Sequence, residues 1–306
     1  MPNEILAWGG FIAFILAMLA LDLFVFQRKA HAIRIRESLA LTAFWVALAL
    51  LFNLLVYWKH GPHAGLEFLT GYLIEESLSM DNIFVFLLIF SYFSVPGSAQ
   101  PKVLFWGILG AIVLRGIFII AGLSLIHQFR WIVYVFGALL IWTGIRIVSE
   151  KDKKIQPERN PVLRLFRKLV PVTEDYEGSR FFVRKQGKCW ATPLLVVAIV
   201  VETTDLIFAV DSIPAIFAVT LNPFIVYTSN IFAILGLRAL YFTLAGMMRR
   251  FHRLRYGLSF ILVFVGVKML IADFYPVPIA IALGVVTSAL AFSIFFSLIS
   301  PEQQKH

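Results

Sequence analysis

Long apolar segments recur along the whole of this sequence, and they constrain its fold more than any other feature. Each runs for about 18 residues or more, which is enough for an α-helix to cross a hydrocarbon core of about 30 Å. The chain of 306 residues is 60% hydrophobic and 15% charged, whereas about a quarter of the residues of a soluble domain are charged. The sequence therefore predicts an all-α polytopic membrane protein.

We expect about nine transmembrane helices, separated by polar breaks. The predicted spans are 5–26, 38–57, 66–93, 102–126, 130–148, 191–219, 223–247, 256–273 and 276–299. The first run has no basic segment before it and no small-residue cleavage site after it. We therefore expect it to stay in place as a helix rather than act as a signal peptide.

Lysine and arginine collect in three of the breaks, at 27–37, 149–190 and 248–255. With nine spans, these three breaks all lie on one side of the membrane, and basic loops mark the cytoplasmic side. The predicted orientation therefore has the N-terminus outside and the C-terminus inside. Because the net charge of +9 is concentrated in these loops, it gives no reason to expect nucleic-acid binding.

Two segments of the chain resemble each other in the order of their charged residues. Glu75 precedes Asp81 by six residues and Asp205 precedes Asp211 by six, and in both segments a Leu-Arg pair and then a Gly-x-base triplet follow. Each segment holds three predicted helices, an odd number, so the two copies form an inverted repeat of the kind found in secondary transporters. The alternative is a chance likeness of apolar segments. The predicted division of the chain is a two-helix segment at 1–60, a first three-helix repeat at 66–148, a basic cytoplasmic loop at 149–190, a second repeat at 191–273, and a C-terminal helix with a short tail at 276–306.

Acidic residues lie inside predicted spans that are otherwise apolar. They are Glu75, Glu76, Asp81, Glu202, Asp205 and Asp211. A charged Asp at the centre of a span costs about 2.5–3.5 kcal/mol, so several together would cost on the order of 10 kcal/mol. A bound cation, protonation, or pairing with the bases Arg115, Arg146, Arg238 and Lys268 would offset that cost. Pairing alone leaves an excess of acids, and it does not explain why they cluster on the first helix of each copy.

The donors around these acids are oxygen atoms, which favour Mg²⁺, Ca²⁺ or Mn²⁺ over Zn²⁺ or Cu²⁺. The predicted metal site consists of Glu75, Asp81, Asn82, Glu202, Asp205 and Asp211, with the hydroxyls of Ser77, Thr203, Thr204 and Ser212 nearby. Pro214 favours a kink or an unwound turn at 210–214, which would turn Asp211 towards the cavity of Glu202. Two roles stay open for Glu75 and Glu76, those of metal ligand and of proton carrier.

The stretch PVLRLFRKLV, at 161–170 in the long basic loop, has an amphipathic pattern. An interfacial helix on anionic lipid would have this pattern. A solvated linker is the alternative, and the sequence leaves both open.

Several stretches occur in collinear order over most of the chain. They are FLTGYLIEESLSMDNIFVF (68–86), FSYFSVP (90–96), GAIVLR (110–115), FFVRKQG (181–187), VETTDLIFAVDSIPAIFAVT (201–220), PFIVYTSNIFAILGLRALYF (223–242) and VGVKMLI (265–271). On these stretches the chain resembles the TerC family. The resemblance implies a nine-span protein of the bacterial inner membrane that exports Mn²⁺. With the orientation predicted from the basic breaks, the N-terminus would be periplasmic and the C-terminus cytoplasmic. The family's acidic positions match Glu75, Asp81, Glu202, Asp205 and Asp211, whereas a basic residue can occur in relatives where this chain has Glu76.

The predicted function is therefore a secondary transporter, not an enzyme, whose partners are the lipid bilayer and a divalent cation. Mn²⁺ is the expected cargo, with Ca²⁺ and Mg²⁺ as alternatives, and no prosthetic group is expected. The coupling to protons and the oligomeric state are open. A non-transporting membrane scaffold or assembly factor and a membrane redox modulator are the competing hypotheses. Cys189 is the only cysteine, so dithiol redox chemistry within one chain is excluded.

Overall fold

The computed structural model describes residues 2–21, 35–149, 160–185, 187–245 and 254–299, and most of these residues are helical. The long helices are α1 (Pro2–Leu21), α2 (Ile35–His60), α3 (Pro62–Tyr92), α4 (Gln100–Gln128), α5 (Ile132–Ser149), α7 (Pro193–Phe217), α8 (Pro223–Ala245), α9 (Leu254–Ile271) and α10 (Ile279–Ile299). Each predicted span overlaps one of these helices. The shorter elements are α6 (Pro161–Leu169) and a hairpin of β1 (Phe182–Lys185) and β2 (Lys188–Ala191).

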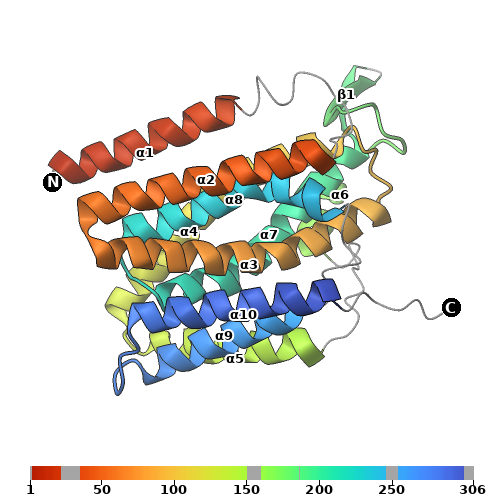
Figure 1. Ribbon diagram of the computed structural model, residues 1–306. Coiled ribbons are helices and arrows are strands. Elements are labelled where there is room, and N and C mark those ends of the chain that lie inside the picture. Colours follow the sequence, from red (N-terminus) through yellow and green to blue (C-terminus); the bar gives the residue numbers. More distant parts are fainter. Residues whose placement is uncertain (1, 22–34, 150–159, 186, 246–253, 300–306) are drawn as a thin grey trace.

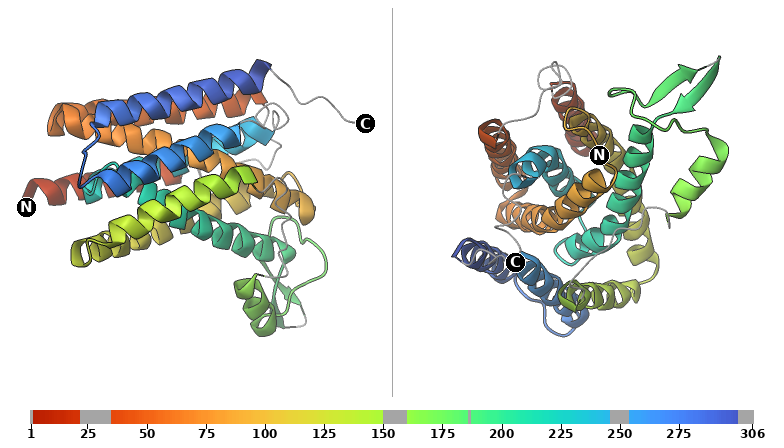
Figure 2. Two further views of the ribbon diagram at one scale, coloured as in Figure 1. Left: turned by 90° about the horizontal axis from the view of Figure 1, so that it is seen from below. Right: turned by 90° about the vertical axis from the view of Figure 1, so that its right-hand side faces the viewer.

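The long helices lie side by side in a bundle with their axes roughly aligned (Figure 1; Figure 2). Helix α8 lies against α2, α3 and α4, while α7 lies against α3 and α4. Helix α5 packs along α9, and α10 packs against both α9 and α3. The four helices α3, α4, α7 and α8 therefore meet one another within the bundle, and they carry the candidate site.

Prolines and side-chain caps set the starts of the helices that meet there. A proline stands in the first turn of α3, α4 and α7, where its missing N–H removes no helical hydrogen bond. At the start of α8, the side chain of Asn222 accepts from the backbone N–H groups of Phe224 and Ile225, at 3.0 and 3.4 Å. An Asn cap of this kind satisfies N–H groups that the helix leaves free.

Six helices of the described residues are long and apolar enough to cross a membrane. They cover 36–60, 100–128, 132–149, 193–217, 223–245 and 279–297. Helix α3 is longer than any of these spans, but it carries the acidic residues Glu67, Glu75, Glu76 and Asp81. The structure thus confirms a helical membrane protein with several spans.

Close approach of α5 and α9 depends on glycines. A Cβ added to Gly266 would lie 2.7 Å from the carbonyl oxygen of Gly137, and one added to Gly144 would lie 2.9 Å from that of Ser259. Distances under about 3.0 Å are not tolerated between a Cβ and backbone. The two helices therefore touch backbone to backbone at two places.

The stretch that the sequence marks as amphipathic is the helix α6. Its N-cap is Asn160, whose side chain accepts from the backbone N–H groups of Val162 and Leu163, at 2.9 and 3.2 Å. Leu163 is 1% exposed and belongs to a hydrophobic cluster that α7 shares with α3, α4 and α8. The long loop thus contains a helix at this stretch, and α6 lies on the outer side of α7 (Figure 2).

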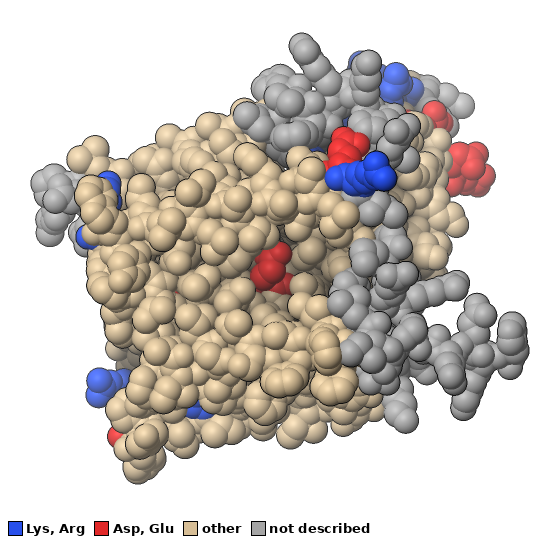
Figure 3. Space-filling model, viewed as in Figure 1, with Lys and Arg blue, Asp and Glu red and all other residues tan. Residues whose placement is uncertain are grey.

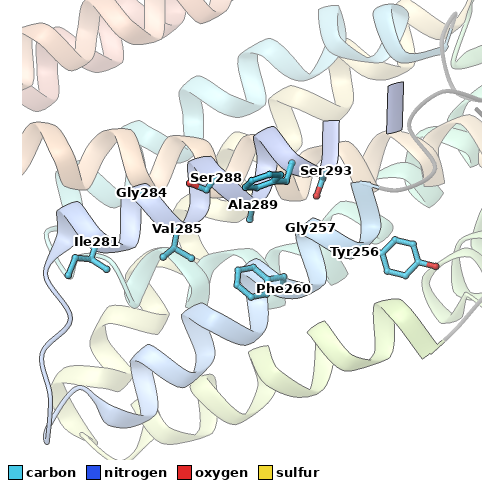
Figure 4. Close-up of a pocket in the computed structure, with 10 residues that line it drawn as sticks. Tyr256, Gly257, Phe260, Ile281, Gly284, Val285, Ser288, Ala289 and Ser293 are labelled. Carbon is cyan, nitrogen blue, oxygen red and sulfur yellow. The ribbon is translucent and has the colours of Figure 1, made fainter. Parts of the chain in front are cut away.

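A groove of about 660 Å³ lies on the outer side of α9 and α10, between Phe260 and Ser288 (Figure 4). Its described lining is apolar apart from the Tyr256 hydroxyl and two serines, and it contains none of the predicted site residues. The groove is therefore separate from the candidate site.

Candidate cation site

A buried guanidinium in the bundle joins acids from two different helices. Arg115, on α4, is 1% exposed. Its Nε and Nη2 donate to the two carboxylate oxygens of Asp205 on α7, at 3.2 and 3.1 Å. Its Nη1 donates to Oε1 of Glu75 on α3, which is fully buried. Because a bidentate guanidinium–carboxylate pair is strongly directional, Arg115 holds Asp205 in a defined orientation.

Two neutral oxygen atoms complete the surroundings of this guanidinium. Oγ of Ser212, on α7, lies 3.4 Å from Nη1 of Arg115, and Oδ1 of Asn230, on α8, lies 3.3 Å from the same atom. Both side chains are buried. One carboxylate from α3, one from α7, and polar oxygens from α7 and α8 thus converge on a single point.

Some carboxylate oxygens at this place are buried but unsatisfied. Within the described residues, Oε2 of Glu75 and Oε2 of Glu202 have no hydrogen-bond partner, and neither has Nδ2 of Asn230. A buried polar group without a partner costs about 1–3 kcal/mol, and a bound water or ion would remove that cost. Two of these three atoms are carboxylate oxygens, which can accept a hydrogen bond from water or coordinate a cation.

Glycines on α4 make room for Glu202. A Cβ added to Gly110 would lie 2.2 Å from Oε1 of Glu202, and Gly107 faces the same side chain. Glu202 and Asp205 line one small cavity between α4 and α7, together with apolar side chains such as Phe86 and Leu237. The Glu202 carboxyl group thus lies in the α4–α7 interface, next to the acid that Arg115 holds.

Asp211 and Asn82 line a second cavity of about 40 Å³, which also borders Ser212. Oδ1 of Asp211 accepts from Oγ1 of Thr143, on α5, at 3.0 Å. Helix α7 is a continuous α-helix across Pro214. The unwound turn expected at 210–214 is therefore absent, and Asp211 borders a different cavity from Glu202.

The surface between the helix ends is almost uncharged on the face shown in Figure 3. Lysine and arginine side chains lie at its two ends, and acidic atoms are visible in a hollow near its middle (Figure 3). A wide uncharged band between charged ends is the surface that a lipid bilayer requires.

The comparison with protein families agrees with this architecture. The model of the "Integral membrane protein TerC family" matches residues 60–305. The chain belongs to the TerC family. No solved structure matches the chain.

Relatives of this TerC protein carry general or uncertain names. A relative from Myxococcus xanthus, described as an uncharacterized membrane protein, is 53% identical over 95% of this chain and 92% of its own length. A protein of Escherichia coli (strain K12) named "Putative membrane-bound redox modulator Alx" is 52% identical over 94% of this chain and 92% of its own. An uncharacterized membrane protein of Rickettsia bellii is 40% identical over 96% of this chain and 97% of its own length.

The structure brings the predicted site residues of this TerC protein into two places. Glu75 and Asp205 meet at Arg115, and Glu202 shares a cavity with Asp205. Asn82 and Asp211 line the second cavity. Asp81 lies on α3, and its side chain is outside the described residues. No three His, Cys, Asp or Glu side chains among the described residues are arranged to hold a metal ion.

The neutral donors that the sequence suggests have different roles in the structure. The hydroxyls of Ser77, Thr203 and Thr204 donate to backbone carbonyls of the preceding turn. Ser212 is the one of the four suggested hydroxyls that contacts Arg115. Of the candidate bases, Lys268 donates to the carbonyl oxygen of Ala218, at 3.0 Å.

Sequence reasoning missed Asn230, Thr143 and Gly110. Asn230 stands in an apolar run, at TSNIFAIL, and an amide inside a membrane helix could have been recognised as a candidate. Thr143 and Gly110 are small residues in spans that hold several others, so no sequence signal separates them from ordinary packing positions.

Proposed function

We propose that this TerC protein is a secondary transporter, not an enzyme, which exports a hard divalent cation through the site formed by Glu75, Glu202 and Asp205. Mn²⁺ is the expected cargo, and Ca²⁺ and Mg²⁺ are the competing ions of the same oxygen-binding class. The observation that carries the proposal is the pair of buried, unsatisfied carboxylate oxygens, Oε2 of Glu75 and Oε2 of Glu202, among the described residues.

Charge balance supports a cation at this place. Glu75 and Asp205 pair with Arg115, and Glu202 shares a cavity with Asp205, so these three acids and Arg115 carry a formal charge of −2 when all are ionised. A divalent cation would neutralise that charge. Since buried charge is costly in a membrane span, a bound divalent cation would offset part of that cost.

Helix packing supports the inverted repeat that such a transporter would use. The proposed symmetry exchanges α3 with α7, α4 with α8, and α5 with α9. It carries the observed contact of α3 with α8 onto the observed contact of α7 with α4. Glu75 and Asp205, which Arg115 joins, hold equivalent positions in the two copies. Substrate sites of inverted-repeat transporters lie at the interface of the copies.

The glycine contacts of α5 and α9 follow the same symmetry. Matching Gly144 with Gly266, as the Gly-x-base triplets do, also matches Gly137 with Ser259. The exchange then carries the Gly137–Gly266 contact onto the contact of Ser259 with Gly144. These two close approaches correspond to each other under the proposed exchange, which supports the repeat.

The location and orientation of the chain are part of the proposal. The helix ends that flank the three basic breaks lie at one end of the bundle, the end where Figure 1 places the C-terminal side of α10. By the positive-inside rule this end faces the cytoplasm. The protein would then span the bacterial inner membrane about nine times, with its N-terminus in the periplasm and its C-terminus in the cytoplasm.

Flux measurements test the proposal directly. Purified protein in proteoliposomes should move Mn²⁺, and parallel assays with Ca²⁺, Mg²⁺ and Zn²⁺ define its selectivity. Asp205→Asn and Glu202→Gln should each reduce the flux at least about tenfold, a change of about 1.4 kcal/mol. Glu174→Gln is the matched control, because Glu174 is an exposed acid outside the spans. Undiminished flux in both site variants would refute the proposal.

One observation favours a second candidate function, that of a non-transporting scaffold. Arg115 pairs with both Glu75 and Asp205, as it would if the acids only joined helices. A scaffold predicts that wild-type proteoliposomes show no metal flux and that Asp205→Asn lowers the amount of protein in the membrane. Normal abundance of Asp205→Asn with lost flux would exclude it.

The name of the Escherichia coli relative is the observation that favours a redox role. Cys189, the only cysteine, is exposed at the start of the strand β2. A redox role that uses this thiol predicts that Cys189→Ser abolishes the function, whereas the transporter proposal predicts Mn²⁺ flux equal to that of the wild type.

A further inference from the structure

The apolar face of α6 is wider than the part that the bundle covers. Leu163 is 1% exposed, and Phe166 packs against the same cluster, so these two side chains attach α6 to α7. Val162 and Leu165 are 48% and 60% exposed. At about 100° per residue, Val162 and Leu165 lie next to each other on the helix surface and beside the buried pair. Part of the apolar face of α6 is therefore left exposed.

The basic side chains lie on the remaining face of the same helix. Arg164 and Lys168 are both exposed, and their spacing of four residues puts them on one side of the helix. An exposed apolar strip beside a basic strip is the pattern of helices that lie in the headgroup region of a membrane.

The attachment of α6 holds it beside a membrane span. Nδ2 of Asn160, the N-cap, donates to Oγ1 of Thr203 on α7 at 2.6 Å. Tyr176, further along the same loop, donates through its hydroxyl to the carbonyl oxygen of Phe93 at 2.7 Å. Helix α6 lies outside the bundle along α7, at the end where α7 begins (Figure 2). If the bundle spans a bilayer, a helix beside it at that end is placed to reach the headgroup region.

We propose that α6 is a lipid-binding element: Arg164 and Lys168 bind the headgroups of anionic phospholipids, and Val162 and Leu165 enter the upper acyl region. Opposite charge selects anionic over zwitterionic headgroups, and each basic side chain near such a surface strengthens binding about fivefold, as about 1 kcal/mol per residue implies. The apolar strip explains why the helix is not merely a solvated linker. The inference does not depend on whether the protein transports a cation.

Site-directed spin labelling tests this placement, and the single cysteine makes the design simple. A nitroxide at Leu165→Cys, in a Cys189→Ser background, reports accessibility to oxygen, which concentrates in lipid, and to a water-soluble nickel complex. The native Cys189, labelled in the wild-type chain, is the control, because it is exposed in the hairpin. The protein is reconstituted in phosphatidylcholine vesicles with and without phosphatidylglycerol. In vesicles with phosphatidylglycerol, we expect an oxygen-to-nickel ratio at position 165 several-fold above that at Cys189.

The charge requirement is tested separately. The double variant Arg164→Gln, Lys168→Gln should reduce the oxygen-to-nickel ratio at position 165, because it removes the two basic side chains. High salt should also reduce this ratio without those two substitutions, since salt screens exposed charges. A water-like ratio at position 165 in both kinds of vesicle would overturn the proposal. A label at position 165 that is shielded from both oxygen and nickel and that shows spin–spin broadening would also overturn the proposal. A second copy of the chain would then cover Val162 and Leu165.

Discussion

Replacing Arg115 by methionine should make the stability of this TerC protein depend on a divalent cation. The substitution keeps an apolar stem of similar length and removes the guanidinium that faces Glu75 and Asp205. Removing one partner of a buried ion pair costs about 3–5 kcal/mol, because the other charge stays buried and uncompensated. Such a loss is a large part of a total stability of about 5–15 kcal/mol.

Mn²⁺ should restore much of that stability in the variant. Without the guanidinium, Glu75 and Asp205 carry a formal charge of −2, which a divalent cation balances. At a Mn²⁺ concentration of about 100 times its Kd, binding to the folded state returns about 2.7 kcal/mol. The wild type should gain less, because the cation has to displace Arg115 from the same oxygens.

Thermal unfolding of the detergent-solubilised protein, followed by tryptophan fluorescence, measures both effects. Arg184→Met is the control, since Arg184 is an exposed arginine in β1, and its stability should not respond to Mn²⁺ more than that of the wild type. If Arg115→Met is destabilised but Mn²⁺ has no effect, the acids serve helix pairing and no cation reaches them. If the variant is as stable as the wild type without metal, the charge argument itself is wrong.

Three further outcomes follow from the structure. Gly110→Ala should reduce Mn²⁺ flux, because the new Cβ would lie 2.2 Å from Oε1 of Glu202 and the carboxyl group would have to move. Gly284→Ala, which meets no atom within 4 Å, should leave the flux unchanged, and equal flux in the two variants would contradict this. Cys189 should react with a membrane-impermeant maleimide only after the cells are permeabilised, and labelling of intact spheroplasts would place it in the periplasm. Asn160→Ala should cost about 1 kcal/mol through the lost cap of α6 and speed proteolysis in the loop, so an unchanged cleavage rate would count against that cap.

The identity of the polar site residues was predictable from the sequence, but their grouping was not. A carboxylate or guanidinium in a long apolar run is visible by inspection, which is why Glu75, Asp205 and Arg115 could be named. Their meeting depends on the rotation of α3, α4 and α7 about their axes, and small residues such as Gly107 and Gly110 set that packing. Helix rotation leaves no mark on a sequence in which nearly every side of a span is apolar.

The expected break in α7 shows how packing can override a local signal. Pro214 removes only the hydrogen bond to the carbonyl of Val210. It lies in the last turn of α7, which ends at Phe217. Ile213, Ala215 and Ile216 are 3%, 0% and 0% exposed, so close packing holds this turn in place. The backbone N–H of Ala218 still donates to the carbonyl of Pro214, at 3.1 Å. One missing bond near a helix end is therefore insufficient to unwind it.

The composition of the Arg115 cluster argues against a role in helix pairing alone. A buried ion pair gives little net stability, and apolar residues of similar volume are often as stable or more so. A cluster that served only stability would thus have no reason to be ionic, and still less to face one guanidinium with two carboxylates. Within the described residues, one carboxylate oxygen of Glu75 and one of Glu202 have no hydrogen-bond partner. Glu202 lines the same cavity as Asp205. Features that cost folding energy and persist at one point in a bundle are expected where a ligand repays them. The unsatisfied carboxylate oxygens are the atoms that the proposed cation would bind.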